Sequence, residues 1–302
     1  MGLAVGRFAG QYRKGFAVGD HALQAGLRAP GGTCRFGNGA AKTHDPVLAV
    51  GLPSWREAQK LARQLNEPTI LYPGGAWLAR SGALGPFSLP DPELAELDTL
   101  FEAACKRRIT EAERRPAQSF GMVNYGETNH INSEIDAAVA FYLQWARTGQ
   151  RKWLDAALDW SLHNQNINVC QASPNPRGIG IHHSHCPSDR NNGGLTPTHA
   201  WVRGQLSRHC LTGDQRSLIV ADLAGRAFDR NATAEGQLFD GGNRRGEIGS
   251  RAYGRADWAL CELYGATGNP AYLDTMGRLN AYLANSLRPD GALSASHDDN
   301  GV

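Results

Sequence analysis

The sequence gathers histidine, tyrosine, glutamate, asparagine and arginine in three polar, glycine-containing segments, at residues 124–134, 178–199 and 241–255. Histidine and tyrosine transfer protons as general acids or bases, and a guanidinium binds a carboxylate through two parallel hydrogen bonds. These are the groups that β-elimination beside a uronic acid requires. A cation neutralises the carboxylate, a base takes the C5 proton, and an acid protonates the departing oxygen.

The candidates for each role follow from these side-chain types. We expect the base or acid to be His183 or His185, with Tyr125 or Tyr253 as its partner. We expect the substrate carboxylate to bind arginine. His199 is predicted one helical turn before Arg203, so that both face the substrate. The predicted substrate contacts are Glu127, Asn132, Glu134, His182, His199, Trp201, Arg203, Arg251 and Arg255.

Other interpretations of the same residues stay open. Glycoside hydrolysis needs two carboxyl groups across the sugar, and Glu127, Glu134, Asp136, Glu247 and Asp257 are candidates. No cofactor is predicted, but three neighbouring histidines with Asp189 could bind a divalent cation. The histidines could also lie at a solvated loop tip, and Trp201 and Trp258 could pack in the interior instead of stacking on a sugar. A glycan-binding module without catalysis is the third class.

Each polar segment precedes the same predicted pair of helices. The helices of a pair are separated by a short turn, at Thr148-Gly149-Gln150, Thr212-Gly213-Asp214 and Thr267-Gly268-Asn269. Glycine adopts the left-handed conformation that ends a helix, and Asp or Asn caps the next one. The first helix of a pair is apolar nearly all round and the second is amphipathic, as in residues 152–164. This repeat predicts inner and outer helices of an α/α toroid or solenoid, with all three segments at one end.

The first third of the chain follows a different pattern. Residues 22–27 and 46–50 are predicted as strands between Gly and Pro, whereas 55–65 and 92–115 are predicted as helices. We therefore expect a mainly α fold, an incomplete α/α toroid over 53–302 that follows a short β remnant over 1–52.

Several motifs resemble the exo-rhamnogalacturonan-lyase-like family. Phe36-Gly-Asn-Gly-Ala-Ala-Lys-Thr-His-Asp is similar to the end of its central β-sandwich, and the toroid motifs lie within residues 115–285. The latter are Gly121-Met-Val-Asn-Tyr-Gly-Glu-Thr, Asn132-Ser-Glu-Ile-Asp, Arg147-Thr-Gly, His199-Ala-Trp and Leu211-Thr-Gly-Asp. The resemblance implies β-elimination on a rhamnogalacturonan-type acidic polysaccharide, and a possible exported location. The family's N-terminal domain is missing and the tail is short, so a fragment or truncated member is expected.

Composition excludes other classes of function. The 31 Lys and Arg against 29 Asp and Glu leave a charge of +2, too small for a nucleic-acid binder. No apolar run reaches the roughly 18 residues that a membrane span needs. Residues 1–10 lack the features of a signal peptide. The six cysteines are scattered, and we expect Cys210 and Cys261 to be buried in helices.

Overall fold

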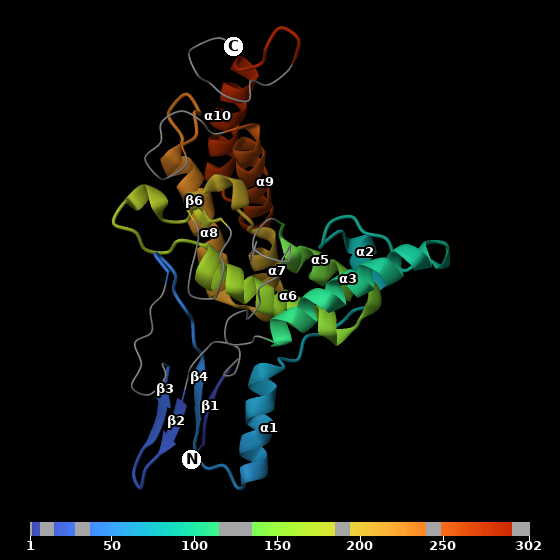
Figure 1. Cartoon of the computed structure of the whole chain (residues 1–302), viewed down its shortest axis with the longest axis vertical. Helices are drawn as coiled ribbons and strands as arrows, with labels where there is room; N and C mark the ends of the chain where they lie inside the picture. The colour runs from blue at the N-terminus through green and yellow to red at the C-terminus, as the bar shows by residue number, and fades with distance from the viewer. Residues whose placement is uncertain are drawn as a thin grey trace.

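The structure is a computed structural model that describes residues 2–6, 15–27, 37–114, 135–184, 194–239 and 249–291, with side chains described up to residue 104 in the third range. In these residues the chain is mainly helical with a few short strands (Figure 1), which confirms the predicted class. None of the helices described here is long and apolar enough to span a membrane.

Three helical hairpins follow one another in the second half of the chain. Each hairpin turns at a glycine with left-handed backbone, Gly149 at φ +70°, Gly213 at +72° and Gly268 at +67°. An L side chain is strained at such angles and glycine is not, so the next helix begins three or four residues after the last residue of the one before it. This confirms the predicted repeat. The helices are α5 (Ala137–Thr148), α6 (Arg151–His163), α7 (Arg203–Thr212), α8 (Gln215–Asn231), α9 (Ser250–Thr267) and α10 (Ala271–Asn285).

The hairpins pack side by side in chain order. Among the first helices, α5 contacts α7 and α7 contacts α9. Each second helix packs against the first helix of its own hairpin. One hydrophobic cluster joins α5 to α6 around Trp153 and Trp160, and another joins α7 to α10 around Phe228 and Leu260. The face of α6 predicted to pack inward is buried, as the amphipathic pattern indicates.

The structure corrects the predicted start of the first helix in the third hairpin. Helix α9 begins at Ser250, so Arg251, Tyr253 and Arg255 lie on a helix and not in a loop. A single interior glycine, Gly254, costs only about 1 kcal/mol and does not end the helix.

The prediction that His199 lies one helical turn before Arg203 is wrong. The Thr196 side chain accepts a hydrogen bond from Thr198 N and caps a 3-10 turn, Pro197–His199. Ala200 then has extended backbone, and α7 begins only at Arg203.

The prediction for the two cysteines is also wrong, because Cys210 on α7 and Cys261 on α9 are exposed. Both belong to helices that bury only part of their surface, and neither is a member of a hydrophobic cluster. A helical pattern alone does not tell which face is covered.

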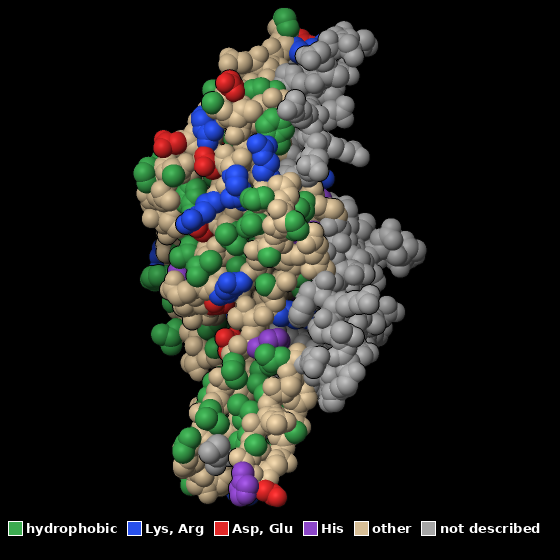
Figure 2. Space-filling model, turned by 90° about the vertical axis from the view of Figure 1, so that its left-hand side faces the viewer, with side chains coloured by type: hydrophobic (Ala, Val, Ile, Leu, Met, Phe, Trp, Pro, Cys, Tyr) green, Lys and Arg blue, Asp and Glu red, His purple; other side chains and the backbone are tan. Residues whose placement is uncertain are grey.

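The N-terminal region forms a small unit of strands and one helix, at the lower end of Figure 1. Two antiparallel pairs and a helix that packs on β1 make up this unit. Its surface exposes large apolar side chains, which spread over the narrow end of the molecule in Figure 2. Both predicted strands and the first predicted helix are confirmed. The elements are β1 (Gly2–Val5), β2 (Gly15–Val18), β3 (Leu23–Gly26), β4 (Pro46–Ala49) and α1 (Trp55–Asn66).

Two further α-helices and a short strand pair complete the α-helices and strands of the described residues. Helix α2 (Gly75–Ser81) packs on α5, and α3 (Ala95–Arg114) confirms the predicted polar helix. An ion pair of 2.7 Å between Arg147 and Asp98 joins α5 to α3. Strand β5 (His182–His183) pairs with β6 (Leu195–Thr196) between the first two hairpins.

Candidate functional site

A pocket of about 340 Å³ lies between the first helices of the three hairpins. It is lined by the first half of α5, the segment that leads into α7, and the middle of α9. The polar segments of the sequence precede these same helices, as the repeat predicts. The lining residues are Ile135, Asp136, Val139, Ala140, Leu143, Ala200, Trp201, Val202, Arg203, Arg255, Trp258, Ala259 and Glu262.

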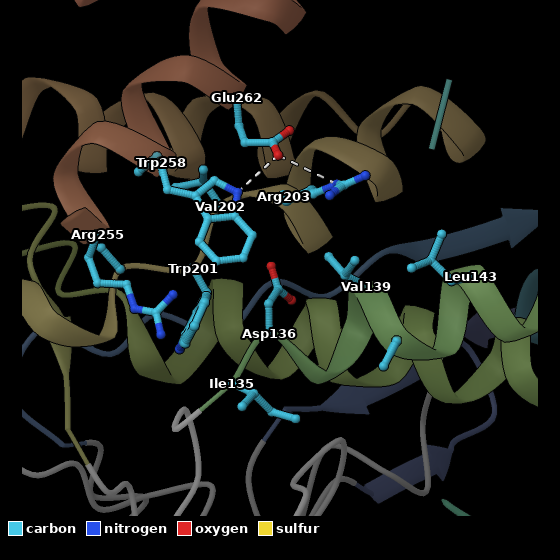
Figure 3. A pocket seen from close by; sticks show the side chains of 13 residues that line it. Ile135, Asp136, Val139, Leu143, Trp201, Val202, Arg203, Arg255, Trp258 and Glu262 are labelled. Atoms are coloured by element: carbon cyan, nitrogen blue, oxygen red, sulfur yellow. Dashed lines mark hydrogen bonds and ion pairs between the residues drawn. The ribbon is translucent and has the colours of Figure 1, made fainter. Parts of the chain in front are cut away.

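Two tryptophans and an arginine form one wall of the pocket (Figure 3). The rings of Trp201 and Trp258 meet edge to face, with centroids 5.9 Å apart. The Arg255 guanidinium lies 3.8 Å from the centroid of Trp201 and 5.4 Å from that of Trp258. Trp201 is 5% exposed and Trp258 is 48% exposed, so Trp258 offers the larger accessible surface. A guanidinium stacked on aromatic rings can bind a carboxylate beside an apolar ring.

Glu262 lies beside Trp258 and is held by two neighbours. Its Oε1 accepts a hydrogen bond of 3.1 Å from Trp258 Nε1 and lies 3.6 Å from Arg203 Nε. Arg203 also donates to the carbonyl of Leu84, which fixes its guanidinium. The Glu262 carboxylate is therefore paired and fixed in place, and it orients Trp258.

Among the titratable groups of the pocket, Asp136 is the one whose pKa is shifted most by its environment. Its Oδ2 accepts a hydrogen bond of 2.9 Å from Gly204 N, and its buried Oδ1 has no hydrogen-bond partner among the described residues. Burial raises the pKa of Asp136 to about 6, and the negative charge of Glu262 acts in the same direction. The two carboxyl groups point into the pocket from opposite sides in Figure 3. Asp136 can therefore exchange a proton near neutral pH.

The structure brings three of the predicted substrate contacts together in the pocket, namely Trp201, Arg203 and Arg255. Arg251 is exposed one turn before Arg255 and does not line the pocket. The sequence left open whether the two tryptophans pack in the interior or stack on a sugar, and the answer differs between them. Trp201 is buried, whereas Trp258 is half-exposed.

The predicted catalytic residues His183 and Tyr253 and the predicted substrate contacts His182 and His199 lie elsewhere. His182, His183 and His199 are all buried and are not among the lining residues. Tyr253 lies in the core, where its hydroxyl accepts a hydrogen bond of 2.9 Å from Leu238 N. Burial raises the pKa of Tyr253 to about 12, so it stays protonated. The remaining predictions, His185, Tyr125, Glu127, Asn132 and Glu134, lie outside the described residues.

Glu262 is a pocket residue that the sequence reasoning missed, and Asp136 was considered only for hydrolysis. A signal for Glu262 was present. Arg255, Trp258, Ala259 and Glu262 follow the i, i+3, i+4, i+7 spacing of one helix face.

The predicted alternative of a cation site finds no support among the described residues, which contain no group of three or more His, Cys, Asp and Glu that could hold a metal ion. His185 and Asp189, which the alternative includes, lie outside them.

Comparison with known proteins gives no further guide to the site. No family model matches the chain, and no curated protein matches it significantly. The chemistry must therefore be inferred from the residues of the pocket.

Proposed function

We propose that the pocket binds a uronate unit of an acidic polysaccharide and that the chain cleaves the glycan by β-elimination. The observation that carries the proposal is the Arg255 guanidinium over the rings of Trp201 and Trp258. A uronate has the matching features, an apolar ring face and a carboxylate. The resemblance to exo-rhamnogalacturonan lyases and the three consecutive hairpins support an α/α toroid with its site at this end.

Each pocket residue has a role in this reaction. Trp258 stacks on the sugar, and Arg255 binds the carboxylate and withdraws charge from C5. Asp136 in its ionised form takes the C5 proton. The electron pair of the broken C–H bond forms the C4–C5 double bond while the C4–O bond breaks. Asp136 then returns the proton to the departing oxygen, so that one group serves as base and acid.

Glycoside hydrolysis is the second candidate, because Asp136 and Glu262 face each other across the pocket. Protonated Asp136 would donate to the leaving oxygen, and the Glu262 carboxylate would act as base or nucleophile. Glu262 is already engaged by Trp258 and Arg203. That engagement reduces its capacity to attack, and it favours elimination.

The test is to incubate the protein with polygalacturonate and rhamnogalacturonan and to follow ultraviolet absorbance and reducing ends together. Elimination yields both signals, because the product carries an unsaturated uronate. Reducing ends without absorbance indicate hydrolysis. Binding without either signal indicates a module without catalysis and contradicts the proposal.

A further inference from the structure

The main-chain carbonyl of Trp201 is held by two buried side chains from other elements. Asn164 Nδ2 donates to it at 2.9 Å, and His182 Nε2 lies 3.3 Å from it. A carbonyl oxygen only accepts hydrogen bonds, so His182 carries its proton on Nε2. Both side chains are fully buried, and neither lines the pocket.

The two donors come from elements that are themselves fixed. Asn164 begins a π-helical turn, Asn164–Asn168, that continues α6, and His182 lies in β5 opposite Thr196. Strand β5 contacts both this π-helical turn and the 3-10 turn before Trp201. A π-helical turn is rare and is frequent at functional sites. The main chain of Trp201 is thus bonded to two elements distant from it in sequence.

Main-chain hydrogen bonds join the N-terminal region to the π-helical turn and to Gln171. Ala41 N donates to Asn166 O at 2.9 Å, and Gly39 O accepts from Gln171 N at 2.8 Å. Gly39 has φ +75°, and a Cβ added there would lie 2.4 Å from Cys170 Sγ. Only glycine fits, so this close approach depends on the residue type.

We propose that His182 and Asn164 are positioning residues that fix Trp201, and through its ring the Arg255 guanidinium, for sugar binding. The inference rests on the proposed function only for the identity of the ligand. His182 acts here as a hydrogen-bond donor and not as the catalytic base.

The protonation state of His182 agrees with this role. Burial lowers the pKa of His182 to about 3, and the neighbouring His199 and His183 add to the effect. The imidazole therefore stays neutral over the working pH range, with one donor nitrogen for the carbonyl.

The first test compares His182→Phe, which keeps the ring without the donor, with His182→Gln, which restores an N–H group. The indole N–H resonances of Trp201 and Trp258 are identified through Trp201→Phe and Trp258→Phe. We expect His182→Phe to shift the Trp201 resonance and to weaken binding of a galacturonate oligosaccharide about fivefold. His182→Gln should restore both. Asn164→Leu is measured in the same way if His182→Phe does not fold.

The second test uses two glycines with nearly the same φ angle. Gly39→Ala forces the chain away from Cys170, whereas Gly51→Ala at φ +76° meets no atom within 4 Å. We expect the Trp201 resonance to shift in Gly39→Ala and to stay unchanged in Gly51→Ala.

The outcomes separate this inference from the proposed function. A Trp201 resonance and a sugar affinity that do not change in His182→Phe and Asn164→Leu overturn the inference. A shifted resonance in a protein that binds no uronate supports the inference and contradicts the proposed function.

Discussion

At the scale of single residues, the pocket combines a carboxyl group with a raised pKa, that of Asp136, and a guanidinium held in place by stacking, that of Arg255. Asp136 accepts a hydrogen bond from Gly204 N and has a buried second oxygen, and Arg255 is stacked on two indoles. The first arrangement suits proton transfer and the second suits carboxylate binding. Each can be tested separately.

Replacing Asp136 with Asn should remove a pH-dependent loss of stability. The folded-state pKa of about 6 lies above the ordinary 3.8, so the unfolded chain ionises first as pH rises. Stability therefore falls between about pH 4 and 6, by about 3 kcal/mol, and the loss is complete above pH 6. Urea denaturation at pH 4 and pH 7 should show this difference in the wild type and much less of it in Asp136→Asn.

Asp257 provides the matched control for that measurement. Its pKa is also raised to about 6 by burial, but the carboxyl is only half-buried and lies outside the pocket. Solvent screening should make the effect of Asp257→Asn on stability smaller. An equal effect of the two variants would contradict the role of burial at Asp136.

Arg255→Lys should weaken uronate binding about tenfold. Lysine keeps the charge but loses the planar stacking on Trp201 and the two parallel hydrogen bonds. Arg251→Lys, one turn earlier on α9 and outside the pocket, should bind like the wild type. Isothermal titration with a galacturonate oligosaccharide compares them, and equal affinities would remove Arg255 from the site.

The residue scale also shows what the sequence could not reveal about the site. The residue types predicted Arg203, Arg255 and Trp201 as substrate contacts, and all three line the pocket. The residue types also predicted His182 and His183, which are buried and do not line the pocket. Burial depends on how β5 and the π-helical turn pack together, and contacts between distant segments leave no local pattern. The same reason hid the raised pKa of Asp136, which arises from burial of its carboxyl group among segments distant in sequence.

At the scale of elements, the hairpins depend on their glycines. Gly213 and Gly149 have nearly the same left-handed angles, but only Gly149 lies against another side chain, because a Cβ added there would lie 2.9 Å from Tyr72 Cε1. Gly213→Ala should cost about 1 kcal/mol for its backbone angle alone. Gly149→Ala should cost more, because Tyr72 must move as well. Chemical denaturation checks this order, and equal losses would contradict it.

These elements were largely predictable because their signals are local. The Thr-Gly turns, the apolar α5 and the amphipathic α6 all follow from residues near one another in sequence. The predicted apolar first helix is wrong for α7, which buries only Gly204, Gln205 and Leu206. The start of α9 and the 3-10 turn at Pro197–His199 were not predicted. The polar composition of residues 241–255 favoured a loop, yet their last residues, from Ser250 on, form the start of α9.

At the scale of the whole molecule, the N-terminal unit and the hairpins meet through a main-chain contact. Residues 39–41 pair with the π-helical turn and with Gln171, and that turn holds the main chain of Trp201. None of the lining residues of the pocket comes from the N-terminal unit. Its contribution to the site is therefore expected to be structural, through the position of Trp201.

The pH dependence of the ultraviolet absorbance that develops in polygalacturonate or rhamnogalacturonan tests the central claim most directly. If Asp136 is the base of an elimination, the rate rises with pH through about 6 and then levels off, and Asp136→Asn abolishes it. Reducing ends that form without absorbance, at a rate that falls above pH 6, would contradict elimination. Absorbance that develops at the wild-type rate in Asp136→Asn would contradict the role of Asp136.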